Sequence, residues 1–151
     1  MKKLNVLFAL LALIFTSCSL DEDSNQNFNF KVMPIVSVDM PDHFIHGETY
    51  AISISYIRPN SCYEFNDFAY EIDGNERIIA IVNTVYGDEN SNCTGEAEEV
   101  TVDFDFTVTS TDTYIFKFFQ GEDHTTGLDQ YHIVEVLVSA GRFIDDKQKG
   151  Y

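Results

Sequence analysis

The chain of 151 residues has no tryptophan, only three cysteines and three prolines, and few basic residues. Its 9 lysines and arginines stand against 25 aspartates and glutamates, which gives a formal net charge of −16 at pH 7. A surface this acidic repels phosphate backbones and anionic lipid headgroups, so we expect no nucleic-acid partner. The charge favours cations, basic proteins or simple solubility.

The start of the chain has an apolar stretch that is too short to span a membrane. Residues 6–15 form ten uncharged apolar residues, fewer than the roughly 20 that a transmembrane helix needs. The stretch follows Lys2 and Lys3 and ends on small polar residues before a cysteine. This order is typical of a signal peptide, which we predict at residues 1–17.

Two short segments, one at the end of this signal and one directly after it, resemble segments of bacterial lipoproteins. Residues 15–18, FTSC, resemble the lipobox, which implies cleavage before Cys18 and a diacylglyceryl group on its sulfur. Residues 19–23, SLDED, resemble the acidic export patch of surface lipoproteins of the Bacteroidetes group. The resemblance implies a protein lipid-anchored to the outer membrane and exposed at the cell surface. The alternative is an ordinary secretory signal cut a few residues later, with Cys18 left as a plain thiol.

The two remaining cysteines, Cys62 and Cys93, predict a disulfide, because an even pair outside the cytoplasm is normally oxidised. A metal site is disfavoured because neither cysteine has another cysteine or a histidine at ligand spacing. A bridge that closes a loop of about 30 residues contributes on the order of 3 to 4 kcal/mol in the chain-entropy model.

The mature chain has the length of one domain with its own core. We expect residues 18–31 to hold the lipidated cysteine and a flexible acidic tether, because this segment is mostly polar. Residues 32–140 are expected to form the folded domain, and residues 141–151 a C-terminal tail.

Strict alternation of apolar and polar residues predicts β-strands. It is clearest at residues 48–57 and 100–109, where one face is Tyr, Ile, Val or Phe and the other Ala, Ser, Thr or Asp. The Asp73-Gly74-Asn75 group predicts a tight hairpin. Further strands are expected at residues 35–40, 67–72, 77–86, 113–119 and 131–139.

The sequence Asp112-Thr113-Tyr114, followed by Phe116 and Phe118, resembles the late strands of immunoglobulin-like domains, where a tyrosine occupies a strand corner. The resemblance implies an all-β fold, a single immunoglobulin-like antiparallel β-sandwich of about seven strands. The chain departs from antibody domains because it lacks tryptophan and has no cysteine in the Tyr114 strand. A small lipocalin-like barrel would give the same pattern and is the alternative.

If successive strands run antiparallel, the connections 58–66, 87–98 and 120–130 meet at one pole, and Cys62 and Cys93 meet with them. Long loops on a rigid sandwich are a common place for recognition, so we expect binding there. The candidate binding residues are Asn60, Tyr63, Asp88, Glu89, Asn90, Glu122, Asp123, His124 and Asp129.

Four of these residues, Asp88, Glu89, Glu122 and Asp123, are candidate calcium ligands, because calcium takes six to eight oxygen ligands. Their spacing matches no known calcium loop, and acidic loops are usually solvated. We therefore expect no cofactor.

The 13 phenylalanines and 8 tyrosines mostly occupy the apolar side of predicted strands and are expected to build the core. A glycan-stacking face is the minority interpretation. Residues for such a face are Tyr63, Tyr86, Tyr131, Phe68 and Phe119.

Catalytic motifs are not evident: no serine lies in a nucleophile elbow and no glycine-rich loop resembles a phosphate cradle. We therefore expect a non-enzymatic surface lipoprotein that binds a protein or glycan, or serves as an accessory subunit of an envelope complex. The alternative is a carrier or sensor of small ligands, built on a closed barrel with a cavity lined by aromatic side chains.

Overall fold

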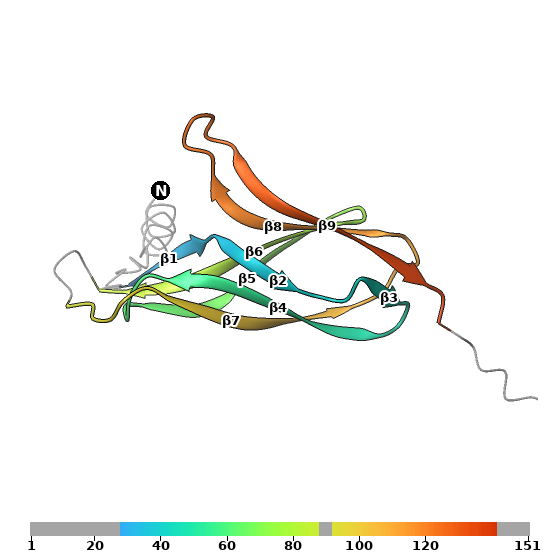
Figure 1. Ribbon diagram of the computed structural model, residues 1–151, viewed down its shortest axis with the longest axis horizontal. Helices are drawn as coiled ribbons and strands as arrows, with labels where there is room; N and C mark the ends of the chain where they lie inside the picture. The colour runs from blue at the N-terminus through green and yellow to red at the C-terminus, as the bar shows by residue number, and fades with distance from the viewer. Residues whose placement is uncertain (1–27, 88–91, 142–151) are drawn as a thin grey trace, which may run out of the picture.

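The alternating segments pair into two β-sheets in the computed structural model (Figure 1), which describes residues 28–87 and 92–141. These residues contain strands and no helix. The strands are β1 (Phe28–Met33), β2 (Ile35–Asp39), β3 (His43–Ile45), β4 (Thr49–Arg58), β5 (Tyr63–Asp73), β6 (Glu76–Tyr86), β7 (Glu98–Thr107), β8 (Tyr114–Glu122) and β9 (Asp129–Ser139).

The larger sheet, called sheet A here, has six strands, and sheet B has three in the order β2-β4-β7. In sheet A, β5 pairs along one edge of β6. Two strands, β1 and β8, share the other edge, each pairing with a different half of β6. There, β1 pairs with residues 81–86 and β8 with residues 76–79. Beyond β8 follow β9 and then β3.

The two sheets pack face to face as a β-sandwich and do not close into a barrel, so the fold class predicted from the alternation is confirmed. The alternative of a lipocalin-like barrel is wrong. Side chains from both sheets fill the space between them, where a barrel carrier would need a ligand cavity. The core residues are Met33, Ile35, Phe44, Ile52, Ile54, Tyr56, Ile79, Ile81, Phe106, Val108, Tyr114, Phe116, Phe118 and Val136.

The seven predicted strands are all present, and β1 and β3 are two more that were not predicted. β3 has only three residues, too few for a period to show. Residues 28–31 were expected in the tether but form most of β1, which pairs with β6. The reason is that Phe28, Phe30 and Val32 alternate with polar residues and extend sheet A.

Pro34 separates β1 from β2 and marks the point where the chain changes sheets. β1 pairs with β6 in sheet A, whereas β2 pairs with β4 in sheet B. Because proline has no N–H to donate, it interrupts a ladder at little cost where the chain crosses. Met33 and Ile35 on either side are both buried in the core.

Five of the seven strand pairs are antiparallel, and two, β6 with β8 and β3 with β9, are parallel. The expectation of purely antiparallel neighbours is wrong here because β7, which lies between β6 and β8 in the chain, belongs to sheet B. The chain crosses to the other sheet and returns before β8 begins, as a parallel pair requires.

Tyr114 forms the predicted tyrosine corner at the start of β8. Its ring is buried, and its hydroxyl oxygen accepts hydrogen bonds from the backbone N–H of Thr109 at 3.1 Å and of Ser110 at 2.8 Å. Burial raises the pKa of the phenol, but hydrogen bonds with the Thr109 side chain and with these two N–H groups, together with the charge of Arg77, outweigh it. The pKa of Tyr114 therefore lies below its usual value. The corner joins the end of sheet B to the start of β8 in sheet A.

Several predictions rest on segments outside the described residues. These are the signal peptide at residues 1–17, the lipid anchor at Cys18, most of the tether and the tail beyond residue 141. Within residues 28–87 and 92–141, no helix is long and apolar enough to cross a membrane.

Candidate functional site

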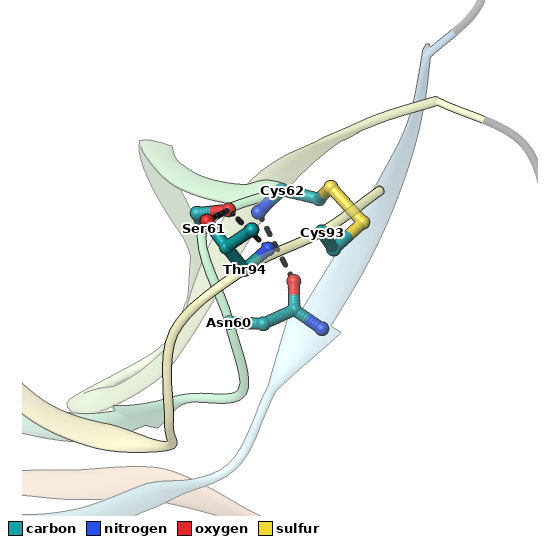
Figure 2. Close-up of a disulfide and its surroundings, with 5 residues drawn as sticks. All are labelled: Asn60, Ser61, Cys62, Cys93 and Thr94. Atoms are coloured by element: carbon teal, nitrogen blue, oxygen red, sulfur yellow. Dashed lines mark hydrogen bonds between the residues drawn. A yellow bond between two sulfur atoms is a disulfide. The ribbon is translucent and has the colours of Figure 1, made fainter. Parts of the chain in front are cut away.

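The predicted disulfide joins Cys62 and Cys93, whose Cα atoms lie 5.4 Å apart (Figure 2). The loops on either side also bond through backbone groups. Ser61 N–H donates to the carbonyl of Thr94 at 2.9 Å, and Thr94 N–H donates to Ser61 Oγ at 2.9 Å. Residues 58–63 and 92–98 are called the bridged end below.

Two predicted binding residues lie at the bridged end. Asn60 uses its Oδ1 to accept the N–H of Cys62 at 3.0 Å, so its side chain supports the loop (Figure 2). Tyr63 accepts a 3.4 Å hydrogen bond from Lys31 Nζ, which also lies 5.5 Å from its ring centroid. Asp88, Glu89 and Asn90 lie outside the described residues.

The third connection, the β8–β9 turn, was expected at the same pole and is not found there. β8 leaves the edge of β6 after Phe118, and β1 pairs with the rest of β6. Figure 1 shows the β8–β9 turn projecting away from the sandwich, well separated from the bridged end. The structure therefore does not bring Glu122, Asp123, His124 and Asp129 together with Asn60 and Tyr63.

Asp123 holds this turn together. Its Oδ1 accepts the N–H groups of Thr125 and Thr126, both at 2.8 Å, and its carbonyl accepts the N–H of Gly127 at 2.7 Å. The backbone hydrogen bonds lower the pKa of Asp123 below its usual value. Asp123 therefore stabilises its own turn and does not form a common binding site with the bridged end.

Asp129 also has a local partner, since it accepts a 3.2 Å hydrogen bond from the hydroxyl of Tyr131. Burial, together with the charge of Asp129, raises the pKa of that tyrosine. Among the described residues, no group of three or more His, Cys, Asp or Glu side chains is placed to hold a metal ion.

One serine–histidine contact occurs, between His43 Nε2 and Ser139 Oγ on the parallel pair β3 and β9. Both side chains are exposed, and in the described part of the chain no carboxylate is hydrogen-bonded to the His43 ring. A catalytic triad needs such a group to orient the imidazole. The contact serves as a side-chain link between the two strands.

The outer face of sheet A is apolar. Alternate residues of its strands fill the core, so those between them point outward. Most of the outward residues on four neighbouring strands are aliphatic or aromatic, and Phe30 is 62% exposed, Ile133 56% and Leu137 64%. This apolar face consists of Phe28, Phe30, Val32, Ile78, Ala80, Val82, Tyr86, Ile115, Phe119, Tyr131, Ile133 and Leu137.

The outer face of sheet B is polar and carries a row of cross-strand hydrogen bonds. Thr49 pairs with Thr107 at 2.9 Å between hydroxyl oxygens, and Ser53 donates to Asp103 at 2.7 Å. Ser55 and Thr101 lie 2.8 Å apart. Asp103 and Asp105, which share this face as expected from the alternation, therefore lie on an ordinary solvated surface.

The apolar face was missed because each strand was judged by one face only. β6 offers a signal, since Ile78, Ile79, Ala80, Ile81 and Val82 form an unbroken apolar run. Such a run is typical of a strand covered on both faces. β8 shows a similar run from Tyr114 to Phe119, interrupted by Lys117.

The chain was compared with models of known protein families, with curated proteins and with solved structures, and none of these matches it.

Proposed function

We propose that this protein is a lipoprotein of the cell envelope, anchored through Cys18, whose sandwich binds a partner protein through the apolar face of sheet A. The observation that carries the proposal is the set of exposed apolar side chains on that face, among them Phe30, Ile133 and Leu137. Soluble monomeric domains rarely leave a contiguous apolar patch uncovered, and such patches commonly mark interaction sites. No catalytic role is assigned to the domain.

The charge around the face favours a partner with basic residues at its rim. β5, next to β6, points Glu64, Asp67 and Glu71 outward, and Glu135 lies between Ile133 and Leu137 on β9. Lys117, the lysine of this face, is paired with Glu76. A partner whose apolar centre is ringed by lysine and arginine would match this arrangement, with rim charges acting on association rate and specificity.

The proposed anchor limits where the partner lies. Nine residues separate Cys18 from Phe28, the first residue of the apolar face. A fully extended chain of this length reaches roughly 35 Å. An anchored domain would therefore stay close to the membrane surface, which favours another envelope protein as the partner.

Site-specific crosslinking in the cells that make the protein tests the face directly. A photoreactive residue is placed at Ile133 on the apolar face or at Ala51 on the outer face of sheet B, both in the full-length chain. We expect one crosslinked protein from position 133 and none from position 51. With the purified partner, Ile133→Asp should weaken binding by about tenfold or more, whereas the matched Ala51→Asp should leave it unchanged.

Equal crosslinking from both faces, or equal binding by both variants, would overturn the docking proposal. The anchor has its own test, the intact mass of membrane-extracted protein beside Cys18→Ala. A lipid-sized increment on a chain that begins at Cys18, lost in the variant, supports the anchor. An unmodified chain contradicts it without touching the docking result.

A glycan is the second candidate partner, favoured by an aromatic cluster at one end of the apolar face. The Phe28 ring centroid lies 5.6 Å from that of Phe30 and 6.2 Å from that of Tyr86. Sugars stack on exposed aromatic surfaces of this kind. If the ligand is a glycan, Tyr86→Ala should lose binding and Ile133→Asp should keep it. If the partner is a protein that covers the face, Ile133→Asp should be the variant that loses binding.

A further inference from the structure

At the end of the sandwich opposite the disulfide, Arg77 points its side chain between the sheets. It is the second residue of β6 and only 7% exposed. Its Nη1 donates to the carbonyl oxygens of Gly74 at 3.0 Å and of Glu76 at 2.7 Å. The guanidinium carbon lies 4.8 Å from the ring centroid of Tyr114. These contacts fix the orientation of the charged group.

The guanidinium of Arg77 forms no ion pair with a carboxylate in the described part of the chain. The ion pairs there join Arg58 to Glu98 and Lys117 to Glu76. The Nε of Arg77 is buried and has no hydrogen-bond partner. Because an unpaired buried cation is costly, a guanidinium in this state favours an incoming anion.

The guanidinium lines a pocket of about 500 Å³ beside the Asp73–Glu76 turn. That volume suits a small organic molecule. The wall also contains Gly74, Asn75, Ser110, Asp112 and Tyr114. The hydroxyl of Ser110 donates to Asp112, and Asn75 Nδ2 donates to the carbonyl of Thr113 at 2.9 Å, which leaves that amide one further N–H.

We propose that this pocket binds a small monocarboxylate, held by Arg77. The planar guanidinium matches a carboxylate in shape and charge. Nη1 is occupied by backbone carbonyls and Nε is enclosed, so the donor left for the ligand is Nη2. The carboxylate of Asp112 in the same wall repels an anion in proportion to its charge, so the site selects a singly charged ligand over a phosphate dianion.

Nuclear magnetic resonance on the full chain tests the proposal, because the sequence has only three arginines, Arg58, Arg77 and Arg142. Acetate is titrated against sodium chloride of matched ionic strength while the arginine Nε–Hε signals and backbone amides are followed. We expect saturable shifts for the Nε–Hε of Arg77 and the amides of Asn75 and Ser110. The Nε–Hε of Arg58, which is already paired with Glu98 at the bridged end, should stay in place.

Two variants separate binding from a structural role. Arg77→Lys keeps the charge but loses the planar donor edge, and should weaken acetate binding by about tenfold. Asp112→Asn removes the repelling charge, lies away from the core, and should tighten binding several-fold. Shifts that chloride reproduces, shifts that do not saturate, or an affinity that Asp112→Asn does not raise would each overturn the proposal and leave Arg77 as a purely structural residue.

Discussion

The two ends of the sandwich are closed by different means. At the bridged end, a covalent bond joins two loops whose cysteines are 31 positions apart. The opposite end is called the corner end and comprises the Asp73–Glu76 turn and residues 108–114. There, one tyrosine hydroxyl accepts hydrogen bonds from the backbone four and five residues upstream. One closure is long-range and covalent, whereas the other is local and depends on burial.

This difference separates stability from binding. The disulfide acts mainly by restricting the unfolded chain, so it leaves the side chains around it free to be polar and exposed. The corner end stabilises the folded state through buried contacts, and these contacts hold Arg77 against Tyr114. We therefore expect substitutions at the bridged end to change stability alone, and substitutions at the corner end to change both stability and the pocket.

The largest effect should follow removal of the covalent closure. Cys62→Ala with Cys93→Ala should lower the free energy of unfolding by about 3 to 4 kcal/mol in the chain-entropy model. Denaturant unfolding of the variant, beside the wild type with and without reductant, measures this loss. Reduced wild type and the double variant should agree. A loss below about 1 kcal/mol would mean that the hydrogen bonds between Ser61 and Thr94 hold the loops together by themselves.

The next largest effect is expected for Tyr114→Phe at the corner end. The ring stays, but the N–H groups of Thr109 and Ser110 lose their acceptor, which should cost about 1 to 3 kcal/mol. Tyr86→Phe is the matched control, because its hydroxyl has no hydrogen bond among the described residues and the side chain is exposed. That control should change the unfolding free energy by less than about 0.5 kcal/mol. Equal losses in the two variants would contradict the corner as a source of stability.

A smaller effect is expected for Ser61→Ala at the bridged end. Ser61 Oγ accepts the N–H of Thr94, but the site is exposed, so water replaces the lost acceptor. The loss should be about 0.5 to 1 kcal/mol in the oxidised protein. In the reduced protein the same substitution should cost more, because the hydrogen bonds then hold the loops without the covalent bond. A double-mutant cycle with the cysteine pair measures this coupling, and strict additivity would contradict it.

How much of the two ends the sequence reveals depends on how local their chemistry is. The disulfide follows from cysteine number, and the corner follows from the short segment Asp112-Thr113-Tyr114, so both were predictable. β3 was not, because three residues are too few for a period to show. The parallel pairing of β6 with β8 was not, because it depends on which sheet β7 joins. β1 was within reach, since Phe28, Phe30 and Val32 already alternate.

The candidate site was harder to predict than the fold. Grouping the three long connections at one pole assumed strict up-and-down order, and the assumption fails where β1 displaces β8 from the edge of β6. Arg77 could have been found, because the alternation that buries Ile79 and Ile81 also points residue 77 inward. A charged residue at a core-facing position is a signal that needs no structure.

The smallest effect concerns the β8–β9 turn, which is closed like the corner end by one side chain that accepts two backbone N–H groups. Because these hydrogen bonds lower the pKa of Asp123 below its value of 3.8 in an unfolded chain, their stabilising effect is fully present above that value. It is lost as the pH falls through the lower pKa of the folded state. The amide signals of Thr125 and Thr126 should therefore shift together in acid, at a lower pH than an unperturbed aspartate titrates.

Asp123→Asn keeps an acceptor oxygen and should hold the turn without this pH dependence, whereas Asp123→Ala should disorder it at every pH. If the two threonine amides titrate in the Asp123→Asn variant as they do in the wild type, another acid controls the turn and its likeness to the corner end fails.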